Sequence, residues 1–270
     1  MKDLVIDVGR IQGDERYEIN LKNENGMILA GFAGTGKTNF LNYMKSQILQ
    51  HDDVKMSIFS SRVTRFDNIL TESFGEDKVK SFIRNKKARV EVKKYVKEID
   101  SRLKRINKSK CDYETYLSNY EKEDKDKLKY HFIFIDDLSI ELFNMRCSDI
   151  NQFNEYINNL KYILEEGSKV GFFLIISGYR CKNGDLPDIL ADSVSCKISF
   201  KNPKIDYFDW NLILDGMKTP NRVGECLILS NSIKNEEGYA TLVKSYLIDK
   251  AINERKYIFE NNKIFSCFLR

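Results

Sequence analysis

A complete phosphate-binding loop lies near the start of the chain. Residues 31–38 read Gly-Phe-Ala-Gly-Thr-Gly-Lys-Thr, which fits the pattern G-x-x-x-x-G-K-T. The short apolar run 27–30 precedes this loop, and residues 39–50 follow it with apolar side chains at helical spacing. Such a loop lets backbone N–H groups and a helix N-terminus surround a polyphosphate. The sequence therefore predicts a strand, a loop and a helix that together hold a nucleoside triphosphate.

Two side chains of the loop have specific expected roles. Lys37 would reach the β- and γ-phosphates of ATP, and the Thr38 hydroxyl would ligate Mg²⁺. The alternative is a chance glycine-rich turn, which the strand before the loop, the helix after it and the Lys-Thr pair make the weaker interpretation. The residues expected to contact ATP are Gly31, Ala33, Gly34, Thr35, Gly36, Lys37, Thr38, Asn39 and, from a later strand, Ser177.

A second motif supplies the acids that such a site needs. The apolar run 132–135 suits a strand covered on both faces, and Asp136 and Asp137 follow it directly. We expect Asp136 to hold Mg²⁺ and Asp137 to orient and deprotonate the attacking water. The alternative is a strand that ends in a turn with two aspartates. Because aspartate is one methylene shorter than glutamate and a general base needs hydrogen-bond reach, nucleotide binding is a safer expectation than rapid turnover.

Composition excludes several classes of protein. In 270 residues, 42% are hydrophobic and 31% charged, which excludes a disordered or membrane-embedded chain. The longest apolar stretch, 170–176, is too short to span a bilayer, and no signal segment opens the chain. The six cysteines form no C-x-x-C pair and there are only two histidines, so we expect neither a zinc site nor a disulfide framework.

The net charge of +4 is unevenly distributed. Residues 78–110 hold 14 Lys and Arg against three acids, so this stretch carries +11 and the rest of the chain −7. Apolar residues recur every three or four positions from Val92 to Ile106, and a second amphipathic segment follows at 113–120. We interpret the pair as a basic helical hairpin inserted ahead of the strand that carries Asp136. Its charge has two interpretations: a solvated surface, or a patch for nucleic acid, anionic lipid or an acidic protein.

Strand-like and helix-like segments alternate along the rest of the chain. Strands are expected at 54–59, 170–176 and 195–200, and helices at 63–74 (after a loop) and 150–165, with a short segment at 185–191. This alternation predicts an α/β fold of the RecA-like P-loop type, with a mostly parallel sheet flanked by helices. Ligands of such sheets bind at the carboxyl ends of the strands. We expect a single domain over 1–270, with an insertion at about 76–128 and a tail at about 247–270.

The order of these segments resembles the FtsK/SpoIIIE-type ATPase domains, and most of all the C-terminal ATPase domain of the type VII secretion proteins EssC and EccC. The phosphate loop alone is unspecific among such ATPases, so the resemblance depends on several segments in sequence. These are Ile-Asp-Val-Gly at 6–9, Tyr-Glu-Ile-Asn-Leu at 17–21, the run 131–138, the run 171–178, Leu-Pro-Asp-Ile-Leu at 186–190, Cys-Lys-Ile-Ser-Phe at 196–200, Asp206-Tyr207 and the run 224–228.

The resemblance implies a motor-like domain that works beside neighbouring ATPase domains or self-assembles in a ring, with ATP at the edge of one domain facing the next. In the secretion branch the substrate is a small helical secreted protein, recognised through a C-terminal signal. The resemblance also implies a place on the cytoplasmic side of the bacterial cell membrane, anchored through the rest of a longer chain. We therefore expect this chain to be a segment of a larger membrane-associated protein.

Departures from the family pattern bear on turnover. FtsK-type translocases place Thr-Gln-Arg where this chain has Gly178-Tyr179-Arg180, and Asp137 replaces the common glutamate. The resemblance thus implies slow, conditional or degenerate hydrolysis. An arginine acting on a neighbour's nucleotide would be Arg62, Arg65, Arg180 or Arg222, and nothing in the sequence favours one of them. The alternative for each is an ordinary surface arginine. Two alternative functions stay open: an FtsK-like DNA translocase for conjugation or segregation, with DNA as partner, and a nucleotide-locked binding module.

Overall fold

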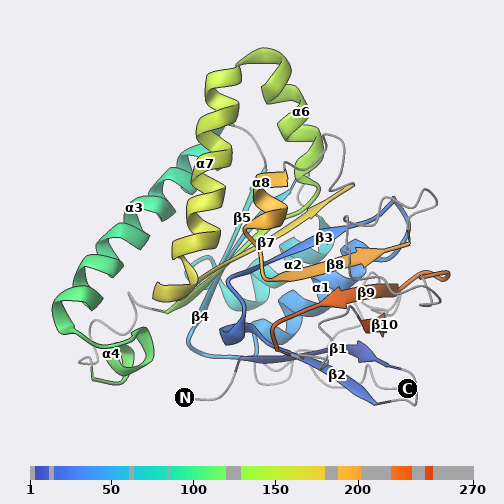
Figure 1. Cartoon of the computed structure of the whole chain (residues 1–270), viewed down its shortest axis with the longest axis horizontal. Helices are drawn as coiled ribbons and strands as arrows, with labels where there is room; N and C mark the ends of the chain where they lie inside the picture. The colour runs from blue at the N-terminus through green and yellow to red at the C-terminus, as the bar shows by residue number, and fades with distance from the viewer. Residues whose placement is uncertain are drawn as a thin grey trace.

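A single ten-stranded sheet forms the centre of the computed structural model, with helices on both of its faces (Figure 1). The structure describes residues 4–11, 15–60, 64–83, 86–119, 129–179, 188–201, 220–232 and 241–245. In sheet order the strands are β2 (Arg16–Asn20), β1 (Val5–Arg10), β10 (Thr241–Ser245), β9 (Glu225–Leu229), β8 (Cys196–Phe200), β3 (Gly26–Ala30), β7 (Phe172–Gly178), β6 (Tyr130–Ile135), β4 (Val54–Ser60) and β5 (Val79–Ile83).

The helices follow the pattern expected from the sequence, with one addition. They are α1 (Lys37–Ile48), α2 (Arg65–Phe74), α3 (Lys86–Ser109), α4 (Tyr113–Asn119), α6 (Leu138–Ser148), α7 (Ile150–Glu166) and α8 (Asp188–Asp192), with 3₁₀ turns at Leu21–Asn23 and Ser168–Val170. The inserted pair α3 and α4 confirms the predicted basic hairpin. Helix α6 was not predicted, because it follows Asp137 without a break and its apolar residues make almost no one-sided pattern.

Six neighbouring strands, from β8 to β5, run parallel, and this half of the sheet was the easier to predict. Strands β3 and β7 are buried at every position, so each appears in the sequence as an unbroken apolar run. Strand β5 was missed, because it is a partly exposed edge strand within the basic stretch. The expected RecA-like, mostly parallel α/β fold is confirmed.

The remaining four strands extend the sheet in antiparallel fashion beyond β8. Their chain order is scattered, since β1 and β2 open the chain and pair with β10 near its other end. Glu24, which is 2% exposed, ties this region to the parallel core: its carboxylate accepts from the hydroxyls of Ser195, Ser230 and Ser232 at 2.6, 2.6 and 3.1 Å. The segment before the phosphate loop is thereby fixed to the strands that follow β8.

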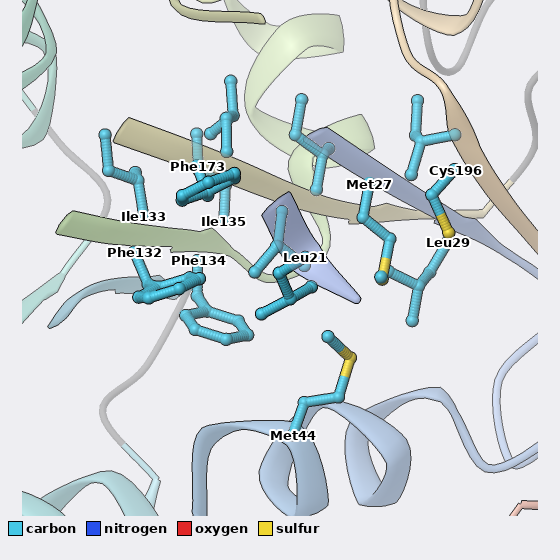
Figure 2. Close-up of a cluster of buried hydrophobic side chains, with 14 of the residues drawn as sticks. Leu21, Met27, Leu29, Met44, Phe132, Ile133, Phe134, Ile135, Phe173 and Cys196 are labelled. Carbon is cyan, nitrogen blue, oxygen red and sulfur yellow. The ribbon is translucent and has the colours of Figure 1, made fainter. Parts of the chain in front are cut away.

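The two faces of the sheet are covered by different helices. Figure 2 shows alternate residues of β6 on opposite sides, with Phe132 and Phe134 directed toward Met44 of α1 and Ile133 and Ile135 directed away from it. Helix α2 shares the α1 side, because Lys45 of α1 pairs with a residue of α2. Helices α3 and α7 contact each other on the opposite face (Figure 1). Because helices cover both faces of the sheet, a ligand can approach it at the ends of the strands.

Candidate nucleotide-binding site

The phosphate loop joins β3 to α1, and two of its positions have a backbone conformation that favours glycine. Gly34 and Gly36 have φ values of 75° and 110°, in the left-handed region, and Gly36 is the N-cap of α1. A side chain on Gly36 would also place its Cβ 3.1 Å from the backbone nitrogen of Gly224, whose N–H donates to the Thr35 carbonyl at 3.0 Å. The loop before β9 therefore packs against the phosphate loop and supports it.

Lys37, the first residue of α1, lies against the backbone of its own loop. Its ammonium donates to the carbonyls of Gly31 and Phe32 at 2.5 and 2.9 Å, and lies 5.5 Å from the centroid of the Tyr179 ring. Burial lowers the pKa of Lys37, and the nearby carboxylates of Asp137 and Asp136 oppose that shift. These groups hold the Lys37 ammonium at the mouth of the loop. There the oxygens of an anion can replace the two carbonyl oxygens as its hydrogen-bond acceptors.

Asp136 and Asp137 follow β6 and are held by Ser177 near the end of the adjacent strand β7. The Ser177 hydroxyl donates to Asp136 Oδ1 at 2.6 Å and accepts from the Asp137 backbone N–H at 2.8 Å. Asp137 has the left-handed backbone angles φ 56° and ψ 56°, which aspartate tolerates better than most residues, and it is the N-cap of α6. Ser177, predicted as an ATP contact, thus touches the site through both aspartates, and β6 and β7 bring these acids to the end of the sheet where the phosphate loop lies.

A cavity of about 470 Å³ opens between the loop and the two aspartates. Most of the residues predicted for the site line it: Ala33, Gly34, Gly36, Lys37, Thr38, Asn39, Asp136 and Asp137. Gly31 and Thr35 lie in the loop itself, and the Thr35 hydroxyl donates to the Phe32 carbonyl at 2.7 Å. The structure thus brings together residues more than 90 positions apart in the sequence. Their roles toward phosphate, metal and water remain predictions.

Four further lining residues were not predicted as ligand contacts: Ser60, Thr64, Tyr179 and Val223. Ser60 ends β4, and the rule that ligands bind at carboxyl ends of strands was sufficient to find it. Thr64 is the N-cap of α2 and forms a capping box with Asp67, a signal present in the sequence as Thr-x-x-Asp. Val223 precedes β9, and no local pattern indicates that this loop returns to the phosphate loop.

Thr64 is positioned by a buried ion pair. Asp67 Oδ2 accepts from the Thr64 hydroxyl at 2.7 Å, and Asp67 Oδ1 lies 2.8 Å from the ammonium of Lys45 on α1. Both charged side chains of this pair are buried, at 3% and 1% exposure. The ion pair thereby joins α1 to the N-terminus of α2, whose N-cap Thr64 lines the cavity.

The candidate arginines are only partly described. Arg65 and Arg222 are exposed, and Arg222 lies next to Val223 at the rim of the cavity. Arg62 and Arg180 lie outside the described residues. A role for any of the four toward a neighbouring domain therefore remains a prediction.

No family model matches the sequence, and no curated protein matches it either. Solved structures do match. The pCW3 conjugation coupling protein TcpA, in monomer form with ATPγS, is 17% identical with a TM-score of 0.69, covering 94% of this chain and 70% of that one. EssC (ATPases 2 and 3) from Geobacillus thermodenitrificans is 18% identical with a TM-score of 0.71, covering 93% of this chain and 46% of that one.

A third match is EccC (ATPases 2 and 3) from Thermomonospora curvata in complex with a signal sequence peptide. It is 13% identical with a TM-score of 0.56, and the match covers 92% of this chain and 41% of that one. The chain therefore spans less than half the length of the EssC and EccC segments that it matches. At these identities the likeness is one of fold, and it confirms the expected resemblance at that level: this chain has the fold of the TcpA and EssC/EccC ATPase domains.

Proposed function

We propose that this chain is an ATP-binding, motor-like domain of a type VII protein secretion ATPase. The observation that carries the proposal is the P-loop cavity, where the glycine loop, Lys37, Thr38 and two aspartates from β6 converge. These residues fit ATP with Mg²⁺: backbone N–H groups and an ammonium for the phosphates, and hydroxyl and carboxylate oxygens for a hard cation. The TcpA structure, which has the same fold, carries ATPγS.

In the proposed mechanism Lys37 exchanges its two carbonyl partners for phosphate oxygens and places its charge beside the β- and γ-phosphates. Thr38 and Asp136 would hold Mg²⁺, which would neutralise charge on the phosphates. Ser177 fixes the orientation of the Asp136 carboxylate, since its hydroxyl donates to Oδ1 of that group. Asp137 accepts the proton of the attacking water, and its shorter reach makes hydrolysis slow or conditional on a neighbouring domain.

A protein substrate is supported by the surface opposite to α1. Helices α6 and α7 form a projecting hairpin (Figure 1), and it exposes Phe143 by 69% and Ile150 by 51%. Exposed apolar side chains suit a protein partner better than a polyanion. Outside residues 78–110 the chain is also net acidic, which opposes a DNA track. We therefore propose a small helical secreted protein as substrate and neighbouring ATPase domains, or copies of this one in a ring, as partners.

The location follows from the same proposal. No helix within the described parts of the chain has the length and apolar character needed to cross a bilayer. We propose that the domain works on the cytoplasmic side of the bacterial membrane, joined to that membrane through other parts of a longer protein.

A second function is DNA translocation in conjugation or segregation. It is favoured by the basic helix α3, which belongs to a chain with the fold of a conjugation coupling protein. A third, a nucleotide-locked binding module, differs from the first only in turnover. Steady-state ATP turnover over a range of chain concentrations, with Lys37→Ala as control, separates these functions.

We expect turnover that is lost in the control and rises faster than chain concentration, because a neighbouring copy completes the site. Turnover no higher than that of Lys37→Ala, together with measurable ATP binding, would indicate the locked module. Stimulation by duplex DNA would indicate the translocase. Absence of any nucleotide affinity in the unaltered chain would contradict all three functions.

A further inference from the structure

A second cavity, of about 280 Å³, lies at the opposite ends of the parallel strands. It is bounded by α3 on one side and by the first residues of β4, β5 and β6 on the other. Along β6, His131 at this cavity is five residues before Asp136 at the P-loop cavity, about 16 Å at the usual rise of a strand. The two cavities therefore share no lining residue and can be tested separately.

The floor of this second cavity is a chain of three polar side chains. Ser57 Oγ lies 2.7 Å from the Tyr95 hydroxyl and 2.8 Å from His131 Nε2, and Ser57 and Tyr95 are 1% and 6% exposed. The His131 ring is also fixed in place, stacked on Phe172 at 5.1 Å and edge-on to Tyr95 at 4.8 Å. The polar atoms of this floor are therefore held rigidly by aromatic packing.

This chain of groups offers a hydrogen-bond donor in either arrangement of its protons. Burial lowers the pKa of His131 to about 3, so the ring is neutral at pH 7 and carries one N–H. If Nε2 accepts from Ser57, the N–H is on Nδ1 and has no acceptor among the described residues. If Nε2 donates to Ser57, one hydroxyl of Ser57 or Tyr95 is left as the donor without an acceptor. The floor therefore suits an acceptor-rich ligand.

The walls add positive charge, and part of it is not engaged. Arg102 donates to Glu98, to Tyr113 and to two backbone carbonyls, and Lys94 pairs with Glu91. Lys55 and Lys80 also line the cavity, and within the described parts of the chain neither has a hydrogen bond or ion pair. Both ammonium groups are close enough to His131 to help lower its pKa, so they share the cavity with the floor.

We propose that this second cavity binds a small phosphorylated molecule, held by the ammonium groups of Lys55 and Lys80 and by the donor of the Tyr95–Ser57–His131 chain. Lysine ammoniums, hydroxyls and an imidazole N–H are single-point donors, and they suit the several oxygens of a phosphate group. A carboxylate is bound best by a guanidinium fork, and Arg102 is already engaged. A nucleic-acid backbone is the weaker candidate, because a cavity of about 280 Å³ has room for a small molecule and not for an extended strand. Asp77, Glu91 and Glu98 also line the cavity, but its five Lys and Arg side chains outnumber them.

The chain provides its own probe, because it has only two histidines, His51 and His131. The test is a titration of ¹⁵N-labelled protein with inorganic phosphate, read from the imidazole nitrogens by NMR at constant ionic strength set with chloride. The Lys37→Ala background removes phosphate binding at the P-loop, and a His51→Gln sample assigns the signals. We expect the His131 signals to shift and saturate in the millimolar range.

The test variant combines Lys55→Gln with Lys80→Gln. The control is Lys97→Gln, since Lys97 is on α3 and exposed but does not line the cavity. We expect the double variant to weaken phosphate binding by about tenfold or more, and the control by less than about twofold, because screened surface charge contributes little. ATP affinity of the chain with Lys37 intact should not change in the double variant.

Three outcomes would overturn the proposal. One is the absence of a saturable His131 shift up to about 50 mM phosphate, a range that covers weak millimolar binding. Another is an equal loss in Lys97→Gln, which would mean diffuse attraction to a basic helix. The last is displacement of phosphate by duplex DNA at micromolar concentration, which would mean a nucleic-acid surface. None of these results bears on ATP binding at the P-loop, because the two cavities share no lining residue. Displacement by DNA would in addition favour the translocase over the protein-secretion function, whereas the other two outcomes leave the proposed function untouched.

Discussion

Lys37 and Lys45 lie on the same helix, about 12 Å apart along its axis at 1.5 Å per residue. Lys45 is 2% exposed and is paired with Asp67, which is itself fully buried. Lys37 is partly exposed and donates to two backbone carbonyls, and among the described residues no carboxylate lies within ion-pair distance of it. The two lysines of α1 thus have different kinds of partner: a fixed anion for Lys45, and replaceable carbonyl oxygens for Lys37.

This difference separates a lysine that stabilises the fold from a lysine that can bind a ligand. A buried charge must keep its partner, because the cost of leaving it alone in a medium of low dielectric constant is several kcal/mol. A cation beside an open cavity can exchange its partners at small cost, because water or a ligand can take their place. We therefore expect changes at Lys45 and Asp67 to act on folding, and changes at Lys37 to act on ATP.

The largest effect should come from Asp67→Ala. This change leaves the Lys45 ammonium buried without its anion and removes the capping box of α2, so the free energy of unfolding should fall by about 3–5 kcal/mol. Equilibrium unfolding in urea measures it. Glu72→Ala, an exposed acid on the same helix, is the control and should change stability by less than about 0.5 kcal/mol.

A double change tests whether the pair itself is the cause. Replacing both members with apolar residues of similar size, as in Lys45→Met with Asp67→Leu, should recover most of the loss, because no uncompensated charge remains. If Asp67→Ala cost less than about 1 kcal/mol, or if the double variant were no better than the single one, the buried pair would not have the role described here.

The next effect is on ATP. Lys37→Ala removes the ammonium that we propose to face the phosphates, and the dissociation constant of a slowly hydrolysed ATP analogue should rise by about a hundredfold or more. Isothermal titration calorimetry measures it, with Lys97→Ala as a control of equal charge change. Asp67→Ala should affect ATP less than this, provided the sample is folded. The comparison between the two lysines is wrong if Lys37→Ala destabilises the fold more than it weakens ATP binding.

The sequence indicated the elements that form the P-loop cavity, whose binding role stays a prediction, and it missed the buried ion pair. The strand that leads to Asp136 and the glycine loop are local patterns, since covered parallel strands appear as apolar runs and phosphate loops have fixed spacing. The Lys45–Asp67 pair is 22 positions apart and exists only once two helices pack on one face of the sheet. No periodicity within either helix indicates it.

The antiparallel half of the sheet was equally hidden. Strand β1 pairs with β10 across more than 230 residues, and Gly224 supports the phosphate loop from a loop before β9. In neither case does the local sequence of one segment indicate which distant segment it contacts. The resemblance to a family was needed to suggest strands there, and only the structure shows their order.

The smallest effect concerns the stability of the fold as a function of pH. Burial lowers the pKa of Lys37 below its ordinary value of 10.5, so the folded state disfavours the charged form more than the unfolded state does. Between the lowered pKa and the ordinary value, the unfolded chain binds more protons than the folded one, and stability rises with pH there. Lys37→Met should therefore be more stable than the unaltered chain at pH 7, by a difference that shrinks as pH rises.

Urea unfolding of the two proteins from pH 7 to about 10.5, the ordinary pKa of lysine, measures this difference. Lys97→Met, at an exposed position of α3, should show no such trend. A difference that grew with pH would mean that the folded state favours the charged form of Lys37. That result would make Lys37 resemble Lys45, a lysine held by a fixed anion, and the distinction between the two lysines of α1 would be lost.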